Sequence, residues 1–314
     1  TAQQLQEYWQ RRESSKPGVG TTREYFYNPP RWEEVQIRAT YRPENRLPRR
    51  RNGKSKKALE QEREALQDQF VIEFSLPKLV FGNNCEMIRD LRAAIELADD
   101  KLSQVPAFPV LPSLQEWTVS RVDVCYNYFV GPLVSDYVTA LSVLEYPRRD
   151  TVRVNAETVE YRAQSVKTKF YDKFAEARLP EAEGLLRHET TFHRAAAIKA
   201  AIHRQGTLYL SDITPEHCRA ILEADLSRLG ILGLSLGNFN TALAALTAEY
   251  GPARATRLFG IIALFQQYTR AEIAVKLGQT RNFVNRCLLD IRKAGVSLTL
   301  PQSDYPLPPL EVDL

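Results

Sequence analysis

The sequence predicts an α+β protein in which an antiparallel sheet carries helices on one face and an all-α domain follows. Three observations support this fold class. Of the 314 residues, 44% are hydrophobic and 25% are charged, the composition of an ordinary globular protein. Segments with strand-like alternation are interleaved with helical segments up to about residue 205. Beyond that point strand patterns disappear and apolar residues recur at helical spacing.

The first part of the chain begins with an N-terminal extension, residues 1–33. Its mixed polar and aromatic sequence ends in Asn28-Pro29-Pro30, which breaks any regular element. Alternation then predicts the strands, and apolar residues at helical spacing predict the helices. The predicted strands are residues 34–41 and 70–76, and the predicted helices are residues 58–69 and a segment that begins at Asn83.

The sheet domain is predicted to span residues 34–205, and its second half contains most of the strands. Trp, Tyr, Phe and Val residues alternate with polar ones there, which is typical of half-buried strands. The predicted strands are residues 117–129, 158–166, 167–174 and 185–192, and the predicted helices are residues 132–144 and 194–204. A helical C-terminal domain is predicted for residues 206–314.

A basic segment, residues 42–57, interrupts the first domain. Pro and Gly residues are interleaved with its Arg and Lys residues, so it cannot bury itself and is predicted to be a loop that contacts phosphates. Its predicted DNA contacts are Arg49, Arg50, Arg51, Lys54, Lys56 and Lys57. A solvated linker without a partner is the alternative. The formal net charge of the chain, +4, says little about partners by itself.

Cysteine spacing and hydropathy predict a cytoplasmic protein that does not enter a membrane. Cys85, Cys125, Cys218 and Cys287 lie far apart, which fits neither a zinc ribbon nor a disulfide framework. No run of about 18 apolar residues predicts a membrane span, and no signal peptide is visible at the start of the sequence.

Three polar clusters interrupt segments that otherwise have the pattern of buried strands. They are Arg121 with Asp123, then Tyr171-Asp172-Lys173, then Arg187-His188-Glu189. A charge on a buried strand is costly unless it is paired or binds a metal, so three clusters in one sheet suggest a common site. Salt bridges on edge strands are the alternative explanation.

The residue types in these clusters suit one reaction. The carboxylates of Asp123 and Glu189, with Asp172 as a third candidate, are hard oxygen ligands for Mg²⁺ or Mn²⁺. Tyr171 is the candidate nucleophile. Lys173 or Arg121 is the candidate cation that offsets charge on a pentacovalent phosphate.

Four motifs together resemble the replication initiators of filamentous phages, the gene II/gene X family, and the related rolling-circle plasmid initiators. The motifs are Ser75-Leu76-Pro77-Lys78-Leu79-Val80-Phe81-Gly82-Asn83-Asn84, Ser120-Arg121-Val122-Asp123, Lys169-Phe170-Tyr171-Asp172-Lys173 and Leu186-Arg187-His188-Glu189. The resemblance covers residues 34–205 and implies a site-specific single-strand DNA endonuclease and ligase. A tyrosine would attack the origin phosphodiester, stay linked to the DNA 5′-phosphate and leave a 3′-OH primer.

The resemblance also implies roles for individual residues. Tyr171 would be the nucleophile with Lys173 beside it, and Arg121 or Arg187 would hold phosphate. The family's turn before the Tyr-Asp-Lys strand is absent here, so Tyr161 is a rival nucleophile. No two histidines are separated by a single residue, so a metal site made of carboxylates is expected in place of a histidine pair. His188 points away from its neighbours on an ideal strand and is expected to pack in the core.

Residues 268–294 have the pattern of a helix-turn-helix. A first helix leads to a turn at Leu277-Gly278, and Thr280 is placed to cap a second helix. The second helix would present hydrogen-bond donors to DNA: Gln279, Arg281, Asn282, Asn285 and Arg286. A plain helical hairpin is the alternative.

Two hypotheses from different classes follow. The first is a rolling-circle initiator that acts on single-stranded or supercoiled origin DNA, with host helicase and polymerase as further partners and a homodimer as a possible state. The second is a non-catalytic DNA-binding regulator that uses the helix-turn-helix and the basic segment. A phosphodiesterase acting on RNA is a third, weaker hypothesis.

Overall fold

The structure is a computed structural model that describes residues 9–16, 20–27, 37–42, 69–105, 108, 110–233, 236, 239–298 and 307–313, with side chains at 37–40 and from 70 onward. Contacts divide the chain into two compact units, Thr1–Leu114 and Gln115–Leu314. The sequence had placed domain boundaries after residues 33 and 205. Among the described residues, no helix has the length and apolarity needed to span a bilayer.

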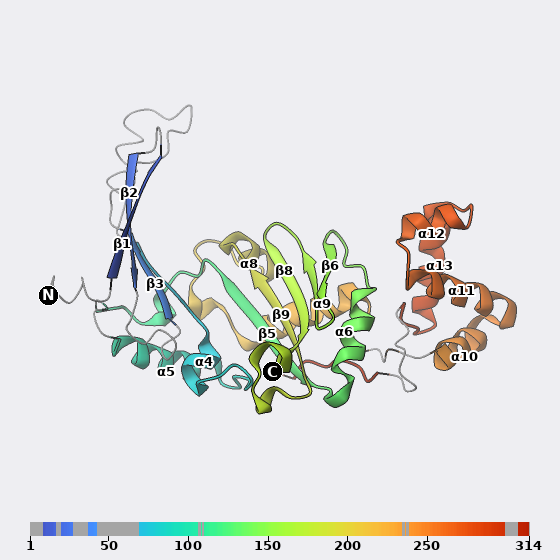
Figure 1. The fold of residues 1–314 in the computed structure, drawn as a ribbon, viewed down its shortest axis with the longest axis horizontal. Helices are drawn as coiled ribbons and strands as arrows, with labels where there is room; N and C mark the ends of the chain where they lie inside the picture. The colour runs from blue at the N-terminus through green and yellow to red at the C-terminus, as the bar shows by residue number, and fades with distance from the viewer. Residues whose placement is uncertain are drawn as a thin grey trace. The chain divides into compact units, whose positions relative to one another are not determined.

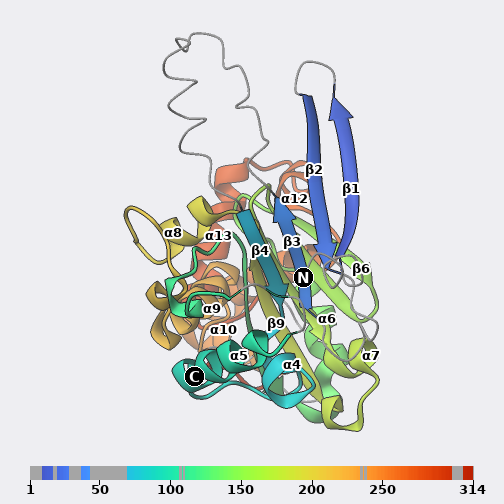
Figure 2. The ribbon, with the colours of Figure 1, turned by 90° about the vertical axis from the view of Figure 1, so that its left-hand side faces the viewer.

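The first unit contains a four-stranded antiparallel sheet with the strand order β1-β2-β3-β4 (Figure 2). Its strands are β1 (Trp9–Lys16), β2 (Gly20–Tyr27), β3 (Ile37–Arg42) and β4 (Gln69–Phe74). The last two confirm the strands predicted at residues 34–41 and 70–76, with shifted ends. The hairpin β1–β2 lies in the extension, where no regular element was predicted, because its charged sequence lacks apolar alternation.

Two helices follow β4 in the first unit. They are α4 (Leu76–Phe81) and α5 (Leu91–Ser103). The helix predicted from Asn83 thus begins later, because the carboxylate of Asp90 accepts a hydrogen bond from the backbone N of Ala93 at 3.0 Å and caps α5. The helix predicted at residues 58–69 lies outside the described residues.

The second unit is built on a five-stranded antiparallel sheet with the order β5-β9-β8-β7-β6 (Figure 1). Its strands are β5 (Val122–Phe129), β6 (Asp150–Asn155), β7 (Thr158–Arg162), β8 (Val166–Asp172) and β9 (Leu185–Phe192). All the strands predicted between residues 117 and 192 are present, and the α+β class is confirmed. Strand β6 was missed because its exposed sequence, DTVRVN, shows only a short alternation.

Short helices connect these strands and the segments beside them. They are α7 (Lys173–Ala177), α8 (Ala195–Ala201) and the 3₁₀ turns η1 (Leu114–Glu116), η2 (Gly131–Leu133), η3 (Pro180–Ala182) and η4 (Leu210–Asp212).

Two helices, α6 (Val134–Ser142) and α9 (Pro215–Leu229), pack against the same face of this sheet. The hydroxyl of Tyr161 on β7 donates to the carbonyl of Leu141 on α6 at 2.5 Å. Phe170 and His188, from β8 and β9, stack under the helices with ring centroids 4.2 Å apart. This core face therefore holds the large apolar residues of the sheet, as expected when one face is covered.

A buried carboxylate joins α9 to the sheet. Asp225 accepts hydrogen bonds from the hydroxyls of Tyr146, Thr168 and Thr190. Arg149 lies 3.7 Å from one of its oxygens, and His188 Nε2 lies 3.4 Å from the other without hydrogen-bond alignment. Burial alone would raise the pKa of Asp225, but the adjacent His188 and the hydrogen bonds from Thr190 and Tyr146 bring it well below its ordinary value.

Four further helices have a hydrophobic core of their own. They are α10 (Phe239–Tyr250), α11 (Pro252–Phe265), α12 (Arg270–Lys276) and α13 (Arg281–Lys293). Leu236, before them, and Leu307, after them, form an antiparallel bridge. Leu307 and Leu310 belong to the core of the sheet, and Tyr137 Oη donates to the carbonyl of Pro308 at 2.5 Å. The four helices are therefore an insertion, and the segment after them returns to the sheet.

Candidate active site

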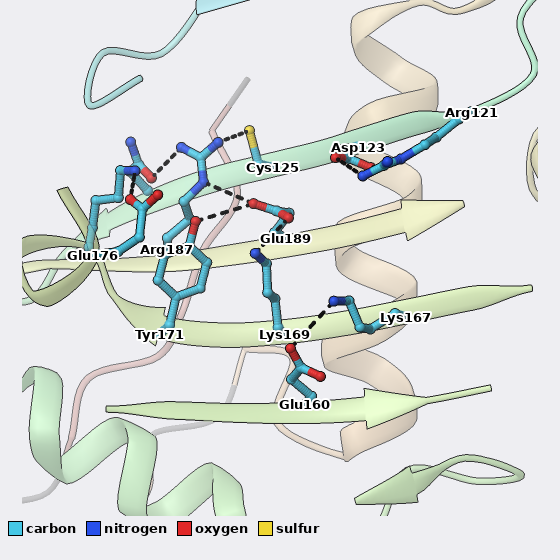
Figure 3. Close-up of polar contacts among 12 residues, drawn as sticks. Arg121, Asp123, Cys125, Glu160, Lys167, Lys169, Tyr171, Glu176, Arg187 and Glu189 are labelled. Carbon is cyan, nitrogen blue, oxygen red and sulfur yellow. Dashed lines mark hydrogen bonds and ion pairs between the residues drawn. The ribbon is translucent and has the colours of Figure 1, made fainter. Parts of the chain in front are cut away.

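One face of the five-stranded sheet carries polar side chains, and we call it the polar face. Residues directly opposite each other in an antiparallel pair share a face. Tyr171 on β8 and Asn127 on β5 are both opposite Arg187 on β9, and Lys169 is opposite Glu189. Strand alternation therefore brings side chains from three strands to one side, as Figure 3 shows for Tyr171, Arg187, Glu189 and Lys169.

Glu189 is at the centre of this face. The hydroxyl of Tyr171 donates a hydrogen bond to Glu189 Oε2 at 3.2 Å. Lys169 Nζ lies 2.9 Å from Glu189 Oε1, and Arg187 Nε lies 3.5 Å from Oε2 (Figure 3). One carboxylate thus contacts a phenol and two cations.

Two side chains of β5 orient Arg187. Its Nη1 donates to Asn127 Oδ1 at 3.1 Å, and its Nη2 donates to the sulfur of Cys125 at 2.9 Å. Burial raises the pKa of the Cys125 thiol, so this sulfur is protonated at neutral pH. Arg187 is 5% exposed, and these contacts hold its guanidinium in a fixed orientation next to Tyr171.

The electrostatics of the cluster keep the proton on Tyr171. Burial raises the pKa of Tyr171 well above its ordinary value, and the charge of Glu189 raises it further. Burial alone would also raise the pKa of Glu189, but Lys169 and Arg187 bring it below its ordinary value. At neutral pH the pair is therefore a neutral phenol that donates to a carboxylate.

Three other predicted residues lie apart from this cluster. Arg121 and Asp123 pair with each other at 3.0 Å near the far end of β5, with side chains 46% and 39% exposed. Asp172 is on the opposite face from Tyr171, and its carboxylate accepts from the backbone N of Phe174 at 2.9 Å to cap α7. Asp172 thus has a local structural contact and is not brought to Glu189.

Lys173 is fully buried, and its ammonium pairs with Glu176. Its Nζ lies 5.9 Å from the centre of the Tyr171 ring, and that of Lys169 lies 4.6 Å from the same point. Lys173 is therefore a neighbour of Tyr171, as predicted, although Lys169 is the cation closer to the ring.

Tyr161 and His188 belong to the core face. Tyr161 is fully buried, and its hydroxyl is occupied by the carbonyl of Leu141. The rival nucleophile is thus on the side of the sheet that α6 covers, where no DNA phosphate can approach a folded protein. His188 is also fully buried and stacks on Phe170, which confirms its expected place in the core.

The structure does not bring the three predicted metal ligands together. Asp123 and Glu189 share the polar face, but each already pairs with a cation, Arg121 and Lys169 respectively. Asp172 is on the other face. No group of three or more His, Cys, Asp or Glu side chains with metal-binding geometry occurs in the described part of the chain.

Sequence reasoning missed Lys169, Asn127 and Cys125 as members of the cluster. The signal was available for Lys169, because it is two residues before Tyr171 and must share its face of a strand. Asn127 and Cys125 could be found only from the pairing of β5 with β9, since residues 60 or more positions apart contact each other there.

The predicted DNA-reading residues lie at the start of α13. Thr280 caps this helix by accepting from the backbone N of Phe283, and Gly278 turns the chain at a φ of 57°. Gln279, Arg281, Asn282 and Arg286 are exposed there, and Asn285 is half-buried. The basic contacts predicted in residues 42–57, namely Arg49, Arg50, Arg51, Lys54, Lys56 and Lys57, lie outside the described residues.

Comparison with models of known protein families, with curated proteins and with solved structures gives no match for this chain.

Proposed function

We propose that the chain is a DNA-nicking and joining enzyme that initiates rolling-circle replication, with Tyr171 as nucleophile. One observation carries the proposal: the Tyr171 hydroxyl donates to the Glu189 carboxylate at 3.2 Å, beside the cations of Lys169 and Arg187. A nucleophile, a proton acceptor and two phosphate-binding cations are the groups that transfer of a phosphoryl group to tyrosine requires.

The proposed reaction uses these groups in one displacement. The Tyr171 oxygen bonds to phosphorus as the bond from phosphorus to the 3′ oxygen breaks, and Glu189 accepts the phenol proton. The leaving 3′ oxygen takes a proton from water and becomes the primer end. Lys169 and Arg187 offset the negative charge that builds on the phosphate oxygens. Attack by a 3′-OH on the phosphotyrosine reverses these steps and rejoins a strand.

The features of helices α12 and α13 support duplex DNA as a binding partner of the chain. A short helix, a glycine turn and a second helix with exposed Arg281, Asn282 and Arg286 match the helix-turn-helix pattern. Guanidinium and amide groups are suited to phosphates and base edges. In this proposal the helical module selects the origin, and the polar face of the sheet cuts it.

The test is a covalent adduct. The chain is incubated with labelled single strands and supercoiled DNA from the genetic element that encodes it, with and without Mg²⁺ or Mn²⁺ and with a chelator. We expect a protein–DNA band that survives denaturing electrophoresis, and peptide mapping should place the DNA on Tyr171. Comparison of adduct formation with and without the chelator tests whether the reaction needs the divalent metal expected from the sequence.

The matched control is Tyr161, the rival nucleophile expected from the sequence. Tyr171→Phe should abolish the adduct. Tyr161→Phe should leave the adduct intact and cost about 1 kcal/mol of stability, because its buried hydrogen bond to Leu141 is lost. An adduct that persists in Tyr171→Phe would remove Tyr171 from the mechanism.

A non-catalytic DNA-binding regulator is the second candidate, and one observation favours it. Tyr171 is only 5% exposed, and burial raises its pKa, so at rest it is a poorly accessible, neutral phenol. Specific binding of duplex DNA without an adduct on any single-stranded or supercoiled substrate would establish this alternative.

A further inference from the structure

Phe129, the last residue of β5, exposes a large aromatic ring beside the candidate active site. The residue is 80% exposed, whereas phenylalanine is normally buried. It alternates with Asn127 and Cys125 along β5, so it lies on the polar face. The exposed ring is therefore available for stacking on the face that holds the candidate nucleophile.

The ring rests on a glycine that leaves room for it. Gly184 has a φ of 75°, and a Cβ there would lie 3.2 Å from Phe129 Cε2 and 2.9 Å from Gly131 Cα. The carbonyl of Gly184 accepts hydrogen bonds from the backbone N atoms of Val130 and Gly131, at 2.9 and 3.1 Å. These hydrogen bonds fix the backbone that carries Phe129. Little backbone conformational entropy is therefore lost when a ligand stacks on the ring.

The position of Phe129 relative to Tyr171 suits a nucleic-acid strand. Tyr171 is two strands away across β9, and Phe129 is two residues beyond Asn127 along β5. With ordinary sheet spacings, the two backbones are roughly 12 Å apart. Lys169 and Arg187 supply positive charge on the same face. An exposed aromatic ring beside cations is a combination that binds single-stranded DNA, because bases stack on the ring while phosphates pair with the cations.

We propose that Phe129 is a stacking platform for a base of the single DNA strand whose phosphate is presented to Tyr171. This inference rests on the proposed function for its geometry, but stacking is measurable without cleavage. It assigns Phe129 a positioning role: the stacked base fixes the register of the strand, so that one particular phosphate reaches the nucleophile.

The experiment measures binding in a background that cannot react. Fluorescein-labelled oligodeoxythymidylate is titrated with the full chain carrying Tyr171→Phe, and anisotropy gives Kd. Adding Phe129→Ala should raise Kd about 5- to 150-fold, the range for loss of one base–aromatic stack. Phe129→Trp should restore tight binding, and its indole fluorescence should be quenched when the oligonucleotide binds.

Two controls separate stacking from general effects. Val154→Ala, at another exposed apolar residue on the edge strand β6 of the same sheet, should leave Kd unchanged. A duplex of the same length should bind equally well with and without Phe129→Ala, because its bases are already stacked. Unchanged single-strand affinity in a folded Phe129→Ala protein overturns the proposal, and so does an equal loss for duplex.

The two proposals can fail separately. If the adduct never forms but Phe129→Ala weakens single-strand binding, the stacking role of Phe129 is supported and the nicking activity is contradicted. If the adduct forms on Tyr171 but Phe129→Ala leaves both Kd and the position of the nick unchanged, the nicking activity is supported and the stacking role of Phe129 is contradicted.

Discussion

At the scale of single residues, the charge balance around Glu189 decides what the polar face can do. Its carboxylate contacts the Tyr171 hydroxyl, and Lys169 at 2.9 Å offsets its charge. A carboxylate stabilised in this way is a good hydrogen-bond acceptor and a weak base. A bound phosphate would compete with Glu189 for Lys169 and Arg187. We infer that substrate binding itself releases Glu189 to accept the proton of Tyr171.

Lys169→Met tests this arrangement, because it removes the charge and keeps most of the side-chain volume. We expect the rate of adduct formation to fall about 100-fold, the usual effect of losing one group that stabilises the transition state. Without Lys169 the pKa of Glu189 must rise, since that cation is the largest influence that lowers it. Because Glu189 accepts a proton only as a carboxylate, the acid limb of the pH–rate profile should move to higher pH.

Lys167→Met is the matched control for this prediction. Lys167 is on the same strand and the same face, but it pairs with Glu160 at 3.4 Å and not with Glu189. Single-turnover rates should stay near the parental value in this variant. Equal loss in both variants would mean that the face acts only through its overall charge.

At the scale of elements, a buried carboxylate adds polar contacts to the apolar packing of α9 on the sheet. Asp225 is 2% exposed and binds hydroxyls from β8, β9 and the segment before β6. The cationic and titratable groups that face it are Tyr146, Arg149 and His188. The pattern of α9 predicts a helix, but it does not predict that this helix belongs to the sheet rather than to the helices after residue 238.

Asp225→Asn should destabilise the protein by about 3 kcal/mol near neutral pH, because it leaves the buried guanidinium of Arg149 without a compensating charge. The folded-state pKa of Asp225 is depressed, so its stabilisation is present above its unfolded pKa of about 3.9 and is lost as the pH falls below it. The difference between the two proteins should therefore shrink as the pH falls below about 4.

Thermal or urea unfolding at several pH values measures this effect. Glu223→Gln, on the same helix, should change stability by less than about 0.5 kcal/mol. A difference between Asp225→Asn and the parent that stays constant from neutral pH to pH 3 would contradict the depressed pKa.

At the scale of the whole molecule, the C-terminal segment completes a core that begins much earlier in the chain. The helical module starts after Leu236, and the chain returns to the sheet at Leu307, which is fully buried. Leu307→Ala should cost about 2–5 kcal/mol, the range for a large-to-small change in a packed core. The loss should appear in the unfolding of the sheet, and Glu311→Ala, at an exposed position nearby, should have little effect. Equal stability of both variants would show that the C-terminal segment does not contribute to the stability of the core.

The sequence by itself determined most of the elements of the second unit, because strand alternation and helical spacing are local properties. The strands at residues 158–174 and 185–192 and the cap Thr280 follow from residues a few positions apart. Alternation also placed His188 in the core. The hairpin β1–β2 was not predicted, because pairing between its strands, and not an apolar pattern, defines it.

Only the tertiary structure decided which side chains meet. Strand order places Arg187 between Tyr171 and Asn127, and the covered face encloses Tyr161 while the polar face keeps Tyr171. It also pairs Glu189 with Lys169 and leaves Asp172 at a helix cap, so the expected trio of carboxylates is not assembled. The physical reason is that a strand fixes the face of each residue locally, whereas its neighbours across the sheet come from pairing between distant segments.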